Sequence, residues 1–144
     1  MRSIDAFREI VAGTREPPPV AKLVGFEMVE AEEGRIVFAI DVGPQHTSPL
    51  GTVHGGIICD VADAALGCAH ASLLDEGETF TTLDLKINFT KPVWEGRLTA
   101  TATVLKSGRT IGLTECRVTD EGGSLVAYAT STCMTLRGEA AAGR

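Results

Sequence analysis

Six segments of the chain read as strands, and in residues 80–89 apolar and polar residues alternate, a spacing typical of a strand with one buried face. Two segments precede residue 53 and four follow residue 79, with the ranges 26–31, 35–42, 80–89, 98–106, 110–119 and 124–136. Glu33-Gly34 and Ser107-Gly108 separate neighbouring segments and predict hairpin turns. Within 80–89 we expect Leu83, Leu85, Ile87 and Phe89 on one face, and Thr82, Asp84, Lys86 and Asn88 on the other.

A different pattern covers residues 53–74, which read VHGGIICDVADAALGCAHASLL. No proline interrupts this stretch, and alanine and leucine, both strong helix formers, recur through it. Its apolar residues leave no wide polar face, so we predict one long and largely buried helix. The sequence Asp75-Glu76-Gly77 then ends it.

The two ends of the chain are expected to lie outside this arrangement. Residues 4–11 have helical spacing, three prolines at 17–19 stop any helix there, and a short helical turn over 20–24 follows. The last residues are rich in alanine and glycine and are expected to fray. We therefore divide the chain into an N-terminal helix with a proline-rich linker (1–19), a single domain (20–136) and a flexible tail (137–144).

The order of elements predicts the fold class. The predicted order is two strands, one long apolar helix and four more strands. This order indicates an antiparallel sheet with one apolar face that must be buried. A curved sheet wrapped around the single helix would bury that face, which is an α+β architecture. A closed barrel would leave no room for so long an apolar helix in 144 residues.

The composition narrows the classes of function. The net charge is −6, and no cluster of lysine or arginine offers a face for nucleic-acid phosphates. The four cysteines form no Cys-x-x-Cys pair and have no histidine at ligand spacing, which argues against a zinc site. No apolar run reaches the ~20 residues that cross a bilayer, and no export signal is recognisable. We expect a cytoplasmic protein without a metal.

The residues of greatest chemical interest run from Ser48 to Asp63, SPLGTVHGGIICDVAD. The predicted helix starts within this stretch, and the first N–H groups of a helix lack intrahelical acceptors and lie at its positive end. Gly55 and Gly56 leave these groups open to a ligand oxygen, so they either form an oxyanion site or simply permit a tight loop. Asp63 lies between two alanines, where a carboxylate needs partners or a function.

The spacing of these residues has a geometric consequence. Gly55 and Asp63 are eight residues apart in one helix, which places them about 12 Å apart along its axis. Both cannot reach one reacting carbon from the same helix, whereas two antiparallel helices related by a two-fold axis can supply one group each. If both act, the protein is at least a dimer. His70, two turns beyond Asp63, is better explained as a packed or capping residue.

The chain resembles the PaaI-like branch of the hotdog-fold thioesterases over residues 20–136, in three linked places. The first is the loop Ser48-Pro49-Leu50-Gly51-Thr52-Val53-His54-Gly55-Gly56, where the family has Asn-Pro-x-Gly-x-x-His-Gly-Gly. The second is an acidic residue, Asp63, seven positions after the second glycine, and the third is the strand end DLKINFTKPV from Asp84 to Val93. The combination is specific, whereas His-Gly-Gly alone is not.

The resemblance implies a hotdog fold, homodimers often paired into homotetramers, and hydrolysis of acyl-CoA, with coenzyme A as part of the substrate and no separate cofactor. It gives Asp63 the role of general base or nucleophile, and Gly55 of the other subunit the N–H that polarises the thioester carbonyl. His54 supports the site, and Thr82 helps to hold the water. The family's asparagine is Ser48 here, and the shorter side chain of serine reaches less far toward the substrate.

Binding of the substrate is assigned to Ser48, Gly56, Lys106 and Arg109. Lys106 and Arg109 flank the turn at Ser107-Gly108 and are either phosphate ligands or part of a solvated hairpin tip, and the same alternatives apply to Lys91 and Arg97. Two other functions stay open: a hotdog hydratase or dehydratase that leaves the thioester intact, and a non-catalytic acyl-CoA-binding protein.

Overall fold

One antiparallel sheet and one central helix form the body of the protein. The computed structural model covers residues 1–144. Its strands are β1 (Phe26–Glu32), β2 (Arg35–Val42), β3 (Thr79–Phe89), β4 (Gly96–Ser107), β5 (Ile111–Thr119) and β6 (Leu125–Leu136). Its helices are α1 (Ser3–Val11), α2 (Pro19–Val24) and α3 (Gly55–Ala71), with short 3₁₀ turns η1 (Pro44–His46) and η2 (Gly138–Ala141). The six strands and the α+β class predicted from the sequence are confirmed.

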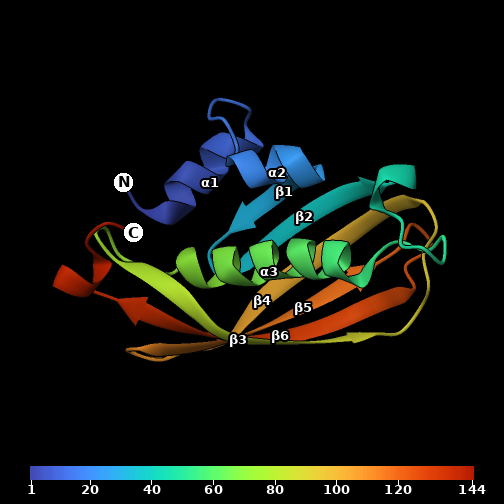
Figure 1. Ribbon diagram of the computed structural model, residues 1–144. Helices are drawn as coiled ribbons and strands as arrows, with labels where there is room; N and C mark the ends of the chain where they lie inside the picture. The colour runs from blue at the N-terminus through green and yellow to red at the C-terminus, as the bar shows by residue number, and fades with distance from the viewer.

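The sheet has the strand order β1-β2-β4-β5-β6-β3, and every neighbouring pair is antiparallel. The chain therefore leaves β2, passes through α3 to the far edge at β3, and returns to the middle of the sheet with β4. In Figure 1, α3 runs across the concave side of the curved sheet, between the N-terminal helices and the strands β4 to β6. This topology leaves β3 as an edge strand that pairs only with β6.

The core fills the space between α3 and the sheet. The inner side of α3 contributes small and branched residues, among them Val61, Ala62, Ala65 and Leu66, each at most 1% exposed. They pack against inward residues of the central strands, such as Ile40, Leu98 and Ala100. The small side chains on the helix let the sheet curve closely around it, so apolar burial holds α3 in place along its length.

The predicted helix over 53–74 is too long at both ends. Val53 instead forms a β-bridge with Thr47 and donates its N–H to the carbonyl of Val93, so the helix begins only at Gly55. At the other end, the Ser72 hydroxyl donates to the carbonyl of Ala69 and accepts the N–H of Gly34. These contacts satisfy backbone groups at the helix end that would otherwise need partners.

The N-terminal segment packs against the domain. Ile4 of α1 is 1% exposed, and Arg2 pairs with Glu33 and donates to the carbonyl of Leu74. Residues of α1, of the proline linker and of β1, β2 and α3 enclose a small apolar cavity of about 70 Å³. The four cysteines are free, and no helix combines the length and apolar character needed to cross a membrane.

Candidate active site

The loop before α3 fixes the first turn of that helix through two histidines. His46 is buried, and its ring accepts the N–H of Gly43 at Nδ1 and lies 2.7 Å from the carbonyl oxygen of Val24 at Nε2. The carbonyl of His46 then accepts the N–H of His54, which is the N-cap residue of α3. The start of α3 is thereby tied to α2 and β2, and sequence reasoning missed the part that His46 plays in this.

Two of the first three N–H groups of α3 already have acceptors. The Gly56 N–H donates to Nδ1 of His54 at 3.0 Å, and the Ile57 N–H donates to the carbonyl of His54 at 3.0 Å. The Gly55 N–H has no acceptor within the chain. One backbone donor at the positive end of the helix is therefore available to an anionic ligand atom, and it belongs to Gly55 rather than to Gly56.

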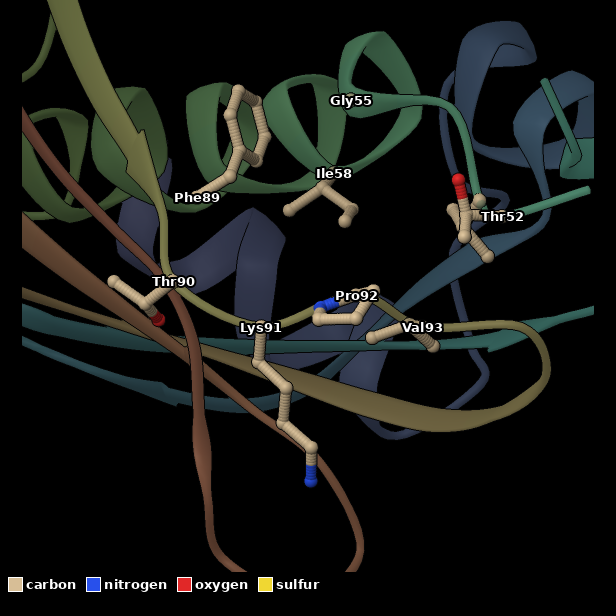
Figure 2. Close-up of a pocket in the computed structure, with 9 residues that line it drawn as sticks. Thr52, Gly55, Ile58, Phe89, Thr90, Lys91, Pro92 and Val93 are labelled. Atoms are coloured by element: carbon tan, nitrogen blue, oxygen red, sulfur yellow. The ribbon is translucent and has the colours of Figure 1, made fainter. Parts of the chain in front are cut away.

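A cavity of about 430 Å³ opens at this end of the helix. Figure 2 shows Ile58 directed into it from α3, with Phe89 beside the helix and Pro92 and Val93 on the opposite wall. The cavity wall is formed by two segments, residues 52–58 and residues 89–93. Of the site residues predicted from the sequence, Gly55 lines it, and so does Lys91, one of the cations considered for phosphate binding. Ile58 and Phe89 were not assigned to the site, although Phe89 belongs to the motif that carries the resemblance.

A side chain at Gly55 would press on the ring of Phe89, which would have to move slightly. A Cβ atom built on Gly55 would lie 3.0 Å from Cζ of Phe89, closer than ordinary van der Waals contact. The Phe89 ring, itself 52% exposed, therefore packs directly on the backbone of the helix start. An apolar ring beside a free N–H lowers the local polarity, which strengthens a hydrogen bond made there.

Asp63 lies on the exposed side of α3 in the single chain. The predicted largely buried helix is confirmed, since Gly56 and Asp63 are the only exposed residues among the seventeen of α3. The Asp63 carboxylate has no hydrogen bond or ion pair. Its pKa is nevertheless raised, first by partial desolvation among its neighbours and then by the negative charge of Asp60. The result is an unpaired carboxylate with an increased affinity for a proton.

Thr82 does not lie on the face expected from the alternation in residues 80–89. A β-bulge interrupts the pairing of β3 with β6, so that Thr82 opposes Cys133 and Asp84 opposes the adjacent Thr132. Leu83 is the extra residue and is 54% exposed. Thr82 therefore shares the helix-facing side with Leu85, and its hydroxyl contacts the buried Sγ of Cys133 at 3.9 Å.

Ser48 is engaged in its own loop. Its carbonyl accepts the N–H of Gly51 across a turn in which Gly51 has φ of 87°, and its hydroxyl accepts the N–H of Leu50. A left-handed φ of this kind favours glycine. The Ser48 side chain thus stabilises the turn that leads to His54, and the structure does not bring it into the cavity beside Gly55.

The four cations considered for phosphate binding differ in their partners. Lys91 pairs with Asp120, and Arg97 pairs with both Glu27 and Asp41. Lys106 and Arg109 are exposed and make no hydrogen bond or ion pair. They lie at the β4–β5 hairpin, whereas Gly55 lies at the opposite end of α3, because Gly112 of β5 is adjacent to His70 near the helix C-terminus.

His70 is a packed residue, in agreement with its interpretation from the sequence. It is 1% exposed, its Nε2 lies 3.0 Å from Oγ1 of Thr135, and its ring packs edge-on against Phe80. Burial lowers the pKa of the imidazole, although the nearby Glu78 acts in the opposite direction. The ring lies against the backbone at Gly112 and does not reach the cavity beside Gly55.

Comparison with known proteins identifies the family. Residues 50–127 match the thioesterase superfamily. The 1,4-dihydroxy-2-naphthoyl-CoA hydrolase of Listeria monocytogenes is 28% identical over 109 residues, which cover 76% of this chain and 89% of the relative. Human acyl-coenzyme A thioesterase 13 is 27% identical over 134 residues, covering 88% and 92%.

Solved structures agree with this assignment. The PaaI protein from the phenylacetic acid degradation operon of E. coli superimposes with a TM-score of 0.81 at 25% identity, covering 92% of this chain and 94% of that one. The sheet wrapped around α3 is thus the hotdog arrangement that the resemblance implied. By its fold and by a match that begins before Gly55 and extends beyond β3, this chain belongs to the thioesterase superfamily.

Proposed function

We propose that the protein hydrolyses acyl-CoA thioesters to the free acid and CoA. The observation that carries the proposal is the pair of unsatisfied groups on α3, a free N–H at Gly55 beside a cavity and an unpaired carboxylate at Asp63. Ester-type hydrolysis needs a donor for the oxyanion and a base for water, and these two groups are of the required kinds. The relatives named for acyl-CoA and naphthoyl-CoA hydrolysis support CoA as the leaving group.

In the proposed reaction, Asp63 takes a proton from a water molecule while the water oxygen attacks the thioester carbon. The negative charge that develops on the carbonyl oxygen is stabilised by the Gly55 N–H. The tetrahedral intermediate then collapses, the carbon–sulfur bond breaks, and the CoA thiolate takes up the proton held by Asp63. A raised pKa suits this exchange, because a base with a pKa closer to neutrality both accepts and returns a proton readily. Attack by Asp63 itself, with an anhydride intermediate, is the other form of the same assignment.

The proposed site is shared between two subunits. Asp63 does not line the cavity beside Gly55, and eight residues of helix separate them by about 12 Å along its axis. We therefore assign the oxyanion donor to Gly55 of the partner subunit. The exposed face of α3 at Gly56 and Asp63, and the edge strand β3 beside it, are the surfaces on which a second copy would pack. We propose a homodimer at minimum, which pairs further into a homotetramer.

The other residues have supporting parts in this proposal. His54 holds the first turn of α3 by accepting the Gly56 N–H, which leaves only the Gly55 donor for the substrate. Thr82 faces α3 and would hold the attacking water. Lys106 and Arg109, which have no acidic partner in the chain, are the cations proposed to meet the phosphates of CoA.

Asp63→Asn tests the assignment, since asparagine keeps the volume of the side chain but cannot accept the proton. We expect turnover of a panel of aryl- and fatty-acyl-CoA substrates to fall about 10²- to 10⁴-fold, measured as free thiol released. Asp60→Asn, one turn earlier on the same helix, is the matched control and should retain most of the activity at neutral pH. More than about a tenth of the wild-type kcat in Asp63→Asn, a deficit under ~1.4 kcal/mol, would count against the assignment.

The same assay separates the two rival functions. A hydratase or dehydratase would change the acyl chain without releasing thiol. A non-catalytic binding protein would leave every substrate unchanged while still binding it.

A further inference from the structure

The β-bulge in β3 determines which way Thr82 faces. Leu85, Ile87 and Phe89 oppose inward residues of β6, so they lie on the helix-facing side of the strand. Strict alternation from these positions would place Thr82 on the outer side of the sheet. The extra residue Leu83 shifts the pattern by one, and Thr82 consequently faces inward. Bulges of this kind redirect a side chain at the expense of one regular backbone pair.

Asp84 stabilises the bulge through both its side chain and its backbone. Its Oδ1 accepts the N–H of Thr132 at 3.0 Å, so a carboxylate oxygen takes a donor of the neighbouring strand beside the irregular pair. Its carbonyl accepts the hydroxyl of Ser131 at 2.9 Å. The carboxylate acceptor makes the first of these hydrogen bonds stronger than a neutral one.

Contacts continue from Asp84 to Thr82. The Ser131 hydroxyl that donates to Asp84 also lies 3.8 Å from Sγ of Cys133, and this sulfur lies 3.9 Å from Oγ1 of Thr82. Ser131 and Cys133 are both buried, so their positions are fixed by packing. Thr82 makes no other side-chain hydrogen bond, and its orientation depends on the bulge and on this sulfur contact.

Thr82 lies near Asp63. A Cβ atom on Gly67 would lie 3.0 Å from Cζ of Phe80, so β3 passes over α3 one turn beyond Asp63, with Thr82 two residues further along the strand. The negative charge of Asp63 also contributes to raising the pKa of Cys133, the direct partner of Thr82, after burial as the larger cause. The Thr82 hydroxyl and the Asp63 carboxylate thus lie on neighbouring parts of β3 and α3.

We propose that Asp84 is a positioning residue, which holds the bulge so that the Thr82 hydroxyl points toward the water used by Asp63. The proposal rests on the proposed hydrolysis, and it adds a residue that touches neither substrate nor water. Removal of the Asp84 carboxylate leaves the Thr132 N–H without its acceptor and lets β3 relax at Leu83. A displacement of Thr82 by an ångström is enough to lower turnover substantially.

Asp84→Ala, Asp84→Asn and Thr82→Ala, alone and combined, test this proposal. We expect Asp84→Ala to lower kcat about tenfold with KM changed less than about twofold, because the chemical step and not binding depends on Thr82. Asparagine retains an oxygen that accepts the Thr132 N–H, so Asp84→Asn should stay within about threefold of wild type. In the Thr82→Ala background the Asp84→Ala change should have almost no further effect, since both act through one hydroxyl.

Lys86→Ala is the matched control, because Lys86 is the next outward residue of β3 and makes no hydrogen bond. The inference is overturned by any of three results: Lys86→Ala lowers kcat as much as Asp84→Ala, Asp84→Ala leaves kcat unchanged, or the losses of kcat in Asp84→Ala and Thr82→Ala multiply fully in the double variant.

Amide hydrogen exchange at Thr132 supplies a readout independent of activity and should be faster in folded Asp84→Ala. Unchanged exchange at Thr132 in Asp84→Ala also overturns the inference about Asp84. If wild type releases no thiol, the proposed hydrolysis fails, and the exchange measurement still tests the role of Asp84 in the bulge. Should Asp84→Ala not fold, Ser131→Ala removes the second hydrogen bond to Asp84 and should lower kcat in the same way.

Discussion

At the scale of single residues, Asp63 combines exposure in the isolated chain with a raised pKa. Partial desolvation, and secondarily the charge of Asp60, disfavours the ionised carboxylate in the folded protein. The folded-state pKa therefore lies above that of an unfolded aspartate, which is about 3.9. The relative stabilisation of the protonated group is present below that value and is lost as the pH rises through the folded-state pKa.

This linkage predicts the stability of Asp63→Asn. The variant does not ionise at this position, so its free energy of unfolding should exceed that of wild type at neutral pH. The difference should shrink as the pH falls through the folded-state pKa, and it should disappear below about 4, where the wild-type carboxyl becomes protonated in both states. Urea unfolding of wild type and Asp63→Asn between pH 7 and pH values below about 4 measures the difference in free energy of unfolding. A difference of the opposite sign at pH 7 would show that the ionised carboxylate is stabilised by partners instead.

At the scale of elements, strand-like segments between turn residues predicted all six strands, and the apolar run predicted α3. In residues 80–89 the burial of one face also leaves a periodic trace in the sequence. The bulge left no such trace. Leu83, Leu85, Ile87 and Phe89 alternate regularly, yet a shift at Leu83 reverses the side on which Thr82 lies. The exposure of Asp63 was also beyond the sequence, since the pattern of α3 alone does not reveal which side the sheet leaves uncovered.

The docking of α1 provides a prediction at this scale. Ile4 is 1% exposed, and we expect Ile4→Ala to lower the free energy of unfolding by about 2–4 kcal/mol through lost burial and the cavity left behind. Val11 lies at the other end of the same helix and is 40% exposed. Val11→Ala should therefore change the free energy of unfolding by less than about 0.5 kcal/mol. Thermal and denaturant unfolding of the two variants provide the comparison. Equal effects would mean that α1 contributes only its helical propensity.

At the scale of the whole molecule, the proposed shared site predicts complementation between two inactive subunits. Gly55→Pro removes the donor N–H at a first-turn position where proline is tolerated, and Asp63→Asn removes the base. In the mixed dimer one site has both defects and the other has none. Random mixing makes about half the dimers hybrid, so recovery should approach about a quarter of wild-type activity.

Mass spectrometry should confirm that subunits exchange in this mixture. If each site were built within one chain, every hybrid would contain only defective sites, and activity would stay at background. A monomer by light scattering that remained active would contradict the shared site independently. In the proposed dimer, Gly55 and Asp63, both recognised from sequence, would act on one substrate only through the second copy.

The open edge at β3 also bears on how the protein reaches its working form. A newly synthesised chain presents a row of unpaired backbone groups there, next to exposed Leu83 and Phe89, and such an edge is a template for joining foreign strands. The charges of Asp84 and Lys86 along the strand limit that risk without removing it. If the proposed dimer forms, renaturation should have a second-order phase. The yield of refolded protein should then depend on the protein concentration, because dimer formation competes with precipitation.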